Sequence, residues 1–182
     1  MARLEIRLLG EPSIRWDGQP WEIARRQARA LLYRLAASPE PVARSQLTFL
    51  FWPDAPDTAA RRNLTQRLSL LRRDLPDPRL VQTTATHVQL DRERVCVDTS
   101  QFRHLLDEAG GRQPASLAEA VDLYTGSFLG GFSLPNAPEF DQWVHAQRSE
   151  MDGLLLDALA DLVDHLADKG DTTAAVAAAR AD

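Results

Sequence analysis

One segment, from about Ala59 to Leu75, constrains the fold more than any other part of the chain. Leucines recur in it at spacings of three and four residues, and at about 100° per residue they fall on one side of an α-helix. These leucines are Leu64, Leu68, Leu71 and Leu75. Asp57 or Thr58 is expected to cap the helix, and Pro76 to end it. The segment therefore predicts an amphipathic helix whose leucine face packs on a core.

The other faces of this predicted helix carry side chains that donate hydrogen bonds, and Asp74 is the only acidic residue between Ala59 and Leu75. Arginine presents a planar fork to guanine or phosphate, glutamine pairs with adenine, and serine and threonine reach base edges or phosphates. The alternative is a solvated helix whose arginines only confer solubility. We favour DNA reading, because solvated helices normally mix both signs of charge. The candidate residues are Arg61, Arg62, Thr65, Gln66, Ser69, Arg72 and Arg73.

The elements around this helix predict its fold class. Alternating apolar residues at 4–8 indicate a strand, and further strands are expected at 13–16 and 21–23, with an Asp17-Gly18 turn between them. Two more helices precede the 59–75 helix, and a hairpin around residues 84–86 follows it. A sheet, three helices and a hairpin together predict an α+β winged helix-turn-helix domain over residues 1–94.

Residues 95–182 have a different texture, rich in alanine, leucine and aspartate. Helices are expected from Asp98 or Thr99 to Gly110, over about 117–124, and from Glu139 to about Lys169, with an interruption near Gly153. The loop between the last two is apolar, so we expect its Phe128, Leu129 and Phe132 to pack inward. Helix pairs of this size predict an all-α, tetratricopeptide-like helical domain. The boundary between the two domains is expected within 92–97.

The overall charge of −5 averages two unlike halves. Residues 1–94 hold 16 arginines, no lysine and 11 acidic residues, a net charge of +5. Residues 95–182 hold 5 basic and 15 acidic residues, a net charge of −10. A polyanion such as DNA is therefore expected to bind the first half and to be repelled by the second.

Further arginines of the first half are candidates for contacts with the DNA backbone. Arg25, Arg26 and Arg29 lie on the first predicted helix, and Arg44 precedes the second. Phosphate contacts fix the register of a protein on the duplex without reading its sequence. Each of these arginines is equally well explained as an ordinary surface residue. We include Arg25, Arg26 and Arg44 in the predicted DNA-binding set.

Longer motifs run through both halves. The first half contains QARALLYRLA and LTFLFWPDAPDTAARRNLTQRLSLLRRDL, and the second contains VDTSQFRHLL, AVDLYTGSFLGGF and FDQWVHAQRSEM. The first set resembles the winged-helix domain of the Streptomyces antibiotic regulatory protein family, which is similar to the OmpR-type effector domain. The second set resembles the bacterial transcriptional activator domain that follows it in that family. The resemblance implies a winged helix that binds promoter repeats and a tetratricopeptide-like domain that aids activation or self-association.

Two positions depart from that family's pattern. The hairpin turn Thr84-Ala85-Thr86 lacks the glycine and basic residues often used for minor-groove contact, which leaves the role of the wing open. Ala43 stands where a serine or threonine usually caps the second helix. We expect Ser45 to cap it instead, two residues later.

No enzyme signature is found in the sequence. There is no Walker-type phosphate loop, and the four histidines have no ligand spacing, so we expect no catalytic residue, metal or cofactor. No stretch approaches the roughly 20 apolar residues of a membrane span. The N-terminus lacks the features of a secretory signal, and the single cysteine, Cys96, has no partner for an internal disulfide. We therefore expect a cytoplasmic protein in which Cys96 is a small core residue.

These observations predict a bacterial, sequence-specific DNA-binding transcription regulator, an activator, that reads promoter repeats with the 59–75 helix. The alternative is a protein-interaction adaptor module of a larger signalling ATPase. Double-stranded DNA is the expected partner, and RNA polymerase and a second copy of the chain are further candidates. The end of the sequence, KGDTTAAVAAARAD, supplies only part of a second helix for a hairpin, so we expect the helical domain to be truncated there.

Overall fold

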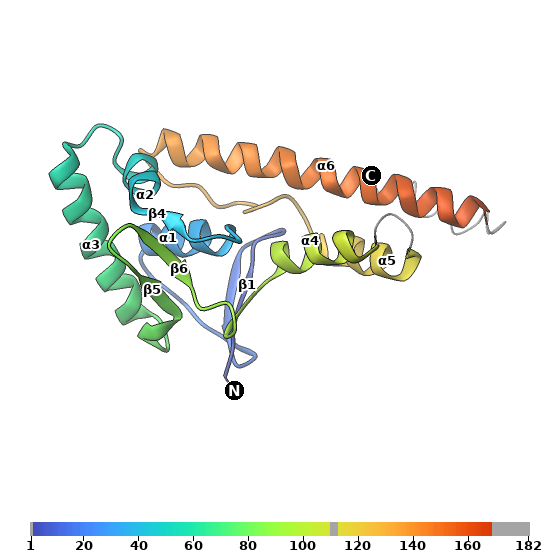
Figure 1. Cartoon of the computed structure of the whole chain (residues 1–182), viewed down its shortest axis with the longest axis horizontal. Coiled ribbons are helices and arrows are strands. Elements are labelled where there is room, and N and C mark those ends of the chain that lie inside the picture. The colour runs from blue at the N-terminus through green and yellow to red at the C-terminus, as the bar shows by residue number, and fades with distance from the viewer. Residues whose placement is uncertain (1, 110–112, 169–182) are drawn as a thin grey trace.

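The computed structural model of the protein describes residues 2–109 and 113–168 (Figure 1). The first part contains β1 (Leu4–Arg7), β2 (Ser13–Trp16), β3 (Gln19–Pro20), α1 (Arg26–Ala36), β4 (Val42–Ala43), α2 (Arg44–Phe51), α3 (Asp57–Asp74), a 3-10 turn η1 (Pro78–Leu80), β5 (Val81–Thr83) and β6 (His87–Leu90). The second part contains β7 (Val95–Val97), α4 (Asp98–Ala109), α5 (Pro114–Leu123) and α6 (Pro138–Asp168).

The first sheet has the strand order β3-β2-β1-β7. The β1–β2 hairpin is antiparallel, as its alternating pattern predicts, and its Asp17-Gly18 turn uses positive φ values at both residues. This two-residue turn pairs Trp16 with Gln19, so the third strand lies at 19–20 and the prediction of 21–23 is wrong. Trp21 follows β3: its backbone N–H still donates to the Ile14 carbonyl of β2, and its indole N–H donates to the Asp74 carbonyl.

The strand β7 was not expected from the sequence. It runs parallel to β1, with Leu4 opposite Val95 and Ile6 opposite Val97. Side chains alternate between the two faces of a strand, so Val95 and Val97 are buried and Cys96 is exposed. The prediction that Cys96 is a core residue is therefore wrong.

The three helices of the first part form as expected, with different starts. Helix α3 begins at Asp57 with Pro56 at the N-cap position, so Asp57 and Thr58 both lie inside the helix and the prediction that one of them caps it is wrong. Helix α2 begins at Arg44, and the Gln46 side chain accepts the backbone N–H of Ala43 at 3.3 Å. This bond serves the N–H of the N-cap residue, and no side chain caps the first N–H groups of the helix. Ser45 lies inside α2, so the prediction that it caps the helix is wrong.

The hairpin β5–β6 confirms the expected wing, and β4 adds a short third strand beside β6. Ala43 lies opposite His87 in this sheet, and the Arg44 backbone N–H donates to the Thr86 carbonyl at 2.8 Å. The start of α2 is therefore fixed next to the turn of the hairpin.

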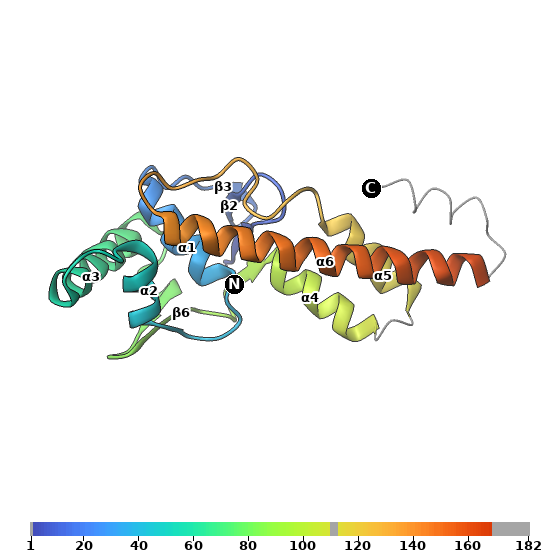
Figure 2. The ribbon, with the colours of Figure 1, turned by 90° about the horizontal axis from the view of Figure 1, so that it is seen from above.

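The second part is helical after β7. Helix α4 packs against α5, which packs against α6. Helix α6 runs without interruption through Gly153, and Figures 1 and 2 show that it extends from beside α2 to beyond α5. Its start packs on α2, where the rings of Phe51 and Phe140 lie 5.6 Å apart. The expected glycine stop at 110–111 and the partial helix after 170 lie outside the described residues.

The two parts share one core. Leu8 and Leu9 are fully buried, and the Asp98 carboxylate at the start of α4 accepts both of their backbone N–H groups at 2.8 to 2.9 Å. The loop after α5 runs along the same segment, since the Leu129 N–H donates to the Leu8 carbonyl. Phe128, Leu129 and Phe132 pack inward, as predicted. Residues 8–10 thus lie between the first sheet and elements of the second part.

Gly10 allows the turn after β1 to approach the loop at Thr125 closely. Its φ is +97°, and a Cβ atom there would lie 2.7 Å from the Thr125 hydroxyl oxygen. That hydroxyl donates to the Leu9 carbonyl at 2.6 Å. A side chain at position 10 would both strain the backbone and break this contact.

Candidate nucleic-acid interface

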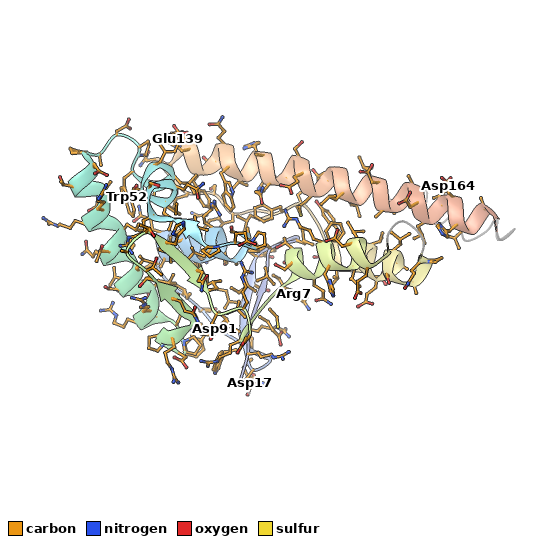
Figure 3. All side chains as sticks on the ribbon, in the orientation of Figure 1. Arg7, Asp17, Trp52, Asp91, Glu139 and Asp164 are labelled. Atoms are coloured by element: carbon orange, nitrogen blue, oxygen red, sulfur yellow. The ribbon has the colours of Figure 1, made fainter. Side chains whose placement is uncertain are left out.

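Helix α3 presents two unlike faces. Leu64, Leu68 and Leu71 on the helix and Leu75 directly after it are buried, as the spacing predicts, and the helix packs on α1, α2 and η1. Figures 1 and 2 place α3 at one end of the molecule, opposite to the end that α5 and the last turns of α6 form. Side chains on its outer side project away from the other elements (Figure 3). The predicted residues of α3 that are exposed are Arg61, Arg62, Thr65, Gln66, Ser69 and Arg73.

Four of these residues form an exposed stripe, which we call the outer stripe: Arg62, Gln66, Ser69 and Arg73. Within the described ranges, the side chains of Arg62, Gln66 and Ser69 have no hydrogen-bond partner in the protein. Arg73 is 63 % exposed, and its nearest carboxylate oxygen, on Asp74, is 3.8 Å away. The stripe therefore offers hydrogen-bond donors to an external ligand.

The residues at the start of α3 contact one another. Arg61 forms an ion pair with Asp57 one turn earlier, with 2.9 Å between Nη2 and Oδ2. The Thr65 hydroxyl donates to the Arg61 carbonyl and accepts from Nη2 of Arg44 at 3.2 Å. The structure thus brings Arg44 of α2 next to Arg61 and Thr65, on the exposed side of the helix pair.

Arg72 is directed to the hairpin. Its guanidinium donates to the Val81 carbonyl at 3.0 Å and to the Thr83 hydroxyl at 2.8 Å. The sequence shows the charge of Arg72 but not this partner, because the contact depends on how η1 returns the chain to α3. Arg72 therefore holds β5 against α3.

We expect Arg72→Ala to loosen the hairpin without unfolding the protein. Removing the side chain leaves the Val81 carbonyl with one partner fewer, at a cost of about 1 kcal/mol. Amide hydrogen exchange in β5 and β6 should then become roughly fivefold faster, while exchange in β1 stays unchanged. Arg73→Ala is the matched control. Equal hydrogen exchange in the two variants would contradict the conclusion that Arg72 holds β5 against α3.

The acidic residues near the end of α3 are paired with arginines. Asp74 forms an ion pair with Arg25 at 2.8 Å. Asp77 binds Arg79 at 3.1 Å and Arg94 at 2.9 Å. Hydrogen bonds from Arg79 and then from Arg94 hold the pKa of Asp77 well below its usual range. Both carboxylates are thus paired with arginines of the protein, so they oppose an anion at α3 only weakly.

Two predicted arginines, Arg25 and Arg26, lie at the start of α1 and not on α3. Arg25 links the start of α1 to the end of α3 through Asp74. Arg26 lies over the ring of Phe132, 5.5 Å from its centroid, and so faces the loop before α6. The contacts of Arg26 therefore do not bring it to the outer stripe.

The hairpin turn adds exposed polar groups that we did not predict. The Thr84 hydroxyl accepts the backbone N–H groups of Thr86 and His87, which tightens the turn. The Thr86 hydroxyl lies 2.9 Å from Nδ1 of His87. His87 is thus an exposed hydrogen-bonding side chain at the wing, and its position after a predicted turn was the only signal for it.

Other kinds of site receive no support within 2–109 and 113–168. No group of three or more histidine, cysteine, aspartate or glutamate side chains there could hold a metal ion. No helix in the same ranges is both long and apolar enough to cross a membrane.

The arrangement of a small sheet, three helices and a β-hairpin that packs on the third helix is a winged helix-turn-helix fold, followed here by further helices. Comparison with solved structures supports this class. The chain is similar to EmbR of Mycobacterium tuberculosis, in a structure of its complex with a low-affinity phosphopeptide, with a TM-score of 0.72 and 22 % sequence identity. The match covers 97 % of this chain and 49 % of the EmbR chain, so this chain spans about half of that length. No protein-family model and no curated protein matches the chain.

Proposed function

We propose that the protein is a sequence-specific DNA-binding transcription regulator that reads base edges with α3. The observation that carries the proposal is the outer stripe, an exposed row of hydrogen-bond donors on a helix at one end of the molecule, of which Arg62, Gln66 and Ser69 have no hydrogen-bond partner in the described chain. A helix fits the major groove, and arginine and glutamine are the side chains that pair best with guanine and adenine there.

The contacts suggest a distinct role for each part of this surface. Arg62, Gln66, Ser69 and Arg73 are the proposed base readers. Arg44, Arg61 and Thr65 form a cluster beside them that suits backbone phosphates, and Arg25 is a further phosphate contact at the end of α3. Arg72 positions the wing.

The shared fold with EmbR over 97 % of the chain supports the winged-helix part of the proposal. The charge division also supports it, since residues 1–94 carry +5 and residues 95–182 carry −10. Because the charge changes sign near residue 94, we propose that residues 1–94 form a DNA-binding domain and residues 95–182 an activator-like, tetratricopeptide-like domain. In this proposal the second domain contacts RNA polymerase or a second copy of the chain to promote activation.

Selection of binding sites from a random-sequence duplex library tests the proposal. The protein should enrich one motif. Arg62→Ala and Gln66→Ala should each remove discrimination at one base pair, worth about 1–3 kcal/mol, with the preference at other positions retained. Arg15→Ala removes an exposed arginine from β2 and is the charge-matched control, which should enrich the unchanged motif.

Two results would contradict the proposal. A library that yields no enriched motif would favour the adaptor function, in which the helical part and the winged helix contact only proteins. An enriched motif that both α3 variants reproduce in full would show that another surface reads the sequence.

A further inference from the structure

A cavity of about 540 Å³ lies where α1 meets the loop before α6. Its walls come from the turn after β1, from α1 and from residues 125–132. A second cavity of about 360 Å³ adjoins it and shares Pro12, Arg29 and Tyr33 with it. The size of each falls in the range of small-molecule sites, which are commonly found where two structural units meet.

Two arginines of α1 line the larger cavity and lack a carboxylate partner. Neither Arg26 nor Arg29 forms an ion pair within the described residues, although Glu11 also lines the cavity. Nε of Arg29 is buried and has no hydrogen-bond acceptor. A buried guanidinium donor without an acceptor is costly, and an anion in the cavity would supply the acceptor.

Tyr33 gives an independent observation that points to the same cavity. Its side chain is only 2 % exposed, and its hydroxyl has no hydrogen-bond partner among the described residues. Burial raises the pKa of this hydroxyl, and the nearby charge of Arg29 opposes the rise. The hydroxyl is therefore a neutral donor close to the Arg29 guanidinium, on the wall that both cavities share.

The helix itself favours an anion at this end. Helix α1 spans 11 residues, has no side-chain cap and has no acidic residue in its first turn. The positive end of its dipole is therefore uncompensated by its own side chains, next to Arg26 and Arg29. The adjoining cavity has mixed walls: Ile14, Trp21 and Ile23 line it together with Ser13 and Glu22.

We propose that these joined cavities bind a small organic anion, with its phosphate or carboxylate group held by Arg26, Arg29 and Tyr33 and its apolar body in the adjoining cavity. The ring of Phe132 lies 5.5 Å and 5.8 Å from the two guanidinium groups and packs edge-on against Tyr33. A bound anion would thus sit between α1 and the loop that leads into α6. If the protein regulates transcription as proposed above, this is a position from which an effector could alter the link from Arg25 to α3.

Titration calorimetry on the full chain at constant ionic strength tests the site without DNA. The probes are inorganic phosphate, phenyl phosphate and benzoate, with chloride as the reference salt. We expect saturable binding at one site per chain, with phenyl phosphate at least tenfold tighter than inorganic phosphate because its ring enters the adjoining cavity. Equal affinity of the two phosphates would overturn the assignment of that cavity to the ligand.

Variants then locate the site. Arg29→Ala should abolish binding of phenyl phosphate, and Tyr33→Phe, which keeps the ring and its packing, should weaken it several-fold. Arg3→Ala, an exposed arginine at the start of the first sheet, is the control and should bind like the unchanged protein. Absence of saturable binding, or binding that Tyr33→Phe and Arg29→Ala leave intact, would overturn the proposal.

Measuring DNA affinity in the same variants tests whether the cavity binds a small ligand or a phosphate of the DNA backbone. Tyr33→Phe should leave the affinity for a selected duplex unchanged while it weakens phenyl phosphate binding. A loss of DNA affinity in Arg29→Ala with phenyl phosphate binding unaffected would overturn the small-ligand site. The calorimetric result does not depend on DNA, so failure of the DNA-binding proposal would leave it intact.

Discussion

Raising the salt concentration from 50 to 200 mM is expected to lower the affinity of the protein for DNA by roughly 150- to 2,000-fold. Each phosphate neutralised by an arginine contributes a slope of about −0.9 to the dependence of log K on log salt, and this range corresponds to about four to six such contacts. The arginines at α3 can supply that positive charge: Arg25, Arg44 and Arg61 are the proposed phosphate contacts, and the exposed Arg62 and Arg73 add charge beside them. The measurement is a series of fluorescence anisotropy titrations with one duplex.

Variants refine the same measurement. Arg61→Ala should reduce the slope by about 0.9 and weaken all duplexes alike, because Arg61 is proposed to contact phosphate. Arg15→Ala should leave the slope unchanged, since it lies on the first sheet. Affinity that stays constant over this salt range would exclude a phosphate-binding surface and with it the proposed function.

Phe128→Ala is expected to lower the free energy of unfolding by about 3–5 kcal/mol, because it removes a large side chain from the core. Phe128 is fully buried, and its ring packs edge-on against Trp143 of α6 at 5.6 Å between centroids. Its backbone also bridges to Leu9 at the end of the first sheet. The cavity left by the ring therefore lies between the two parts of the chain.

The form of the unfolding transition tests whether the two parts are independent. Because residues 8–10 bond to both Asp98 and the loop at 125–130, we expect one cooperative transition that shifts as a whole in Phe128→Ala. Phe49→Ala is the matched control, since Phe49 is 62 % exposed on α2 and its loss should cost little. Two separate transitions, with only one moved by Phe128→Ala, would show that the parts fold separately.

Such cooperativity bears on how the proposed domains would work. A boundary near residue 94 separates the charges well, yet β7 and Asp98 complete the first sheet and its end. A fragment that ends at residue 94 would leave the edge of β1 from Leu4 to Ile6 unpaired and would remove the Asp98 acceptor of the Leu8 N–H. DNA-binding assays are therefore best carried out on the whole chain.

Arg26 shows how contacts change a prediction made from charge alone. On the sequence, Arg25 and Arg26 are equivalent neighbours at the start of a helix. Arg25 is the extended N-cap residue and Arg26 the first residue of α1, and Arg25 reaches Asp74 of α3 whereas Arg26 reaches Phe132 of the loop. The first is a candidate for DNA phosphates, and the second belongs to the proposed anion cavity.

Local periodicity determined much of the fold from the sequence alone. The leucines of α3 and the alternation of Leu4 and Ile6 predict their elements correctly, because burial of one face of a helix or strand requires a fixed spacing. The hydrogen-bonding residues of the outer stripe could be predicted for the same reason, as the face opposite to the leucines.

Long-range contacts were decided only by the tertiary structure. Strand β7 has three residues, too few for a pattern, and exists because β1 offers an unpaired edge beside Val95. The pairing of Arg72 with the hairpin and the contact of Arg26 and Arg29 with the ring of Phe132 depend on how separate segments pack. Periodicity reports which face of an element is buried, whereas the partner of a polar side chain depends on which segment the whole chain brings within about 3 Å of it.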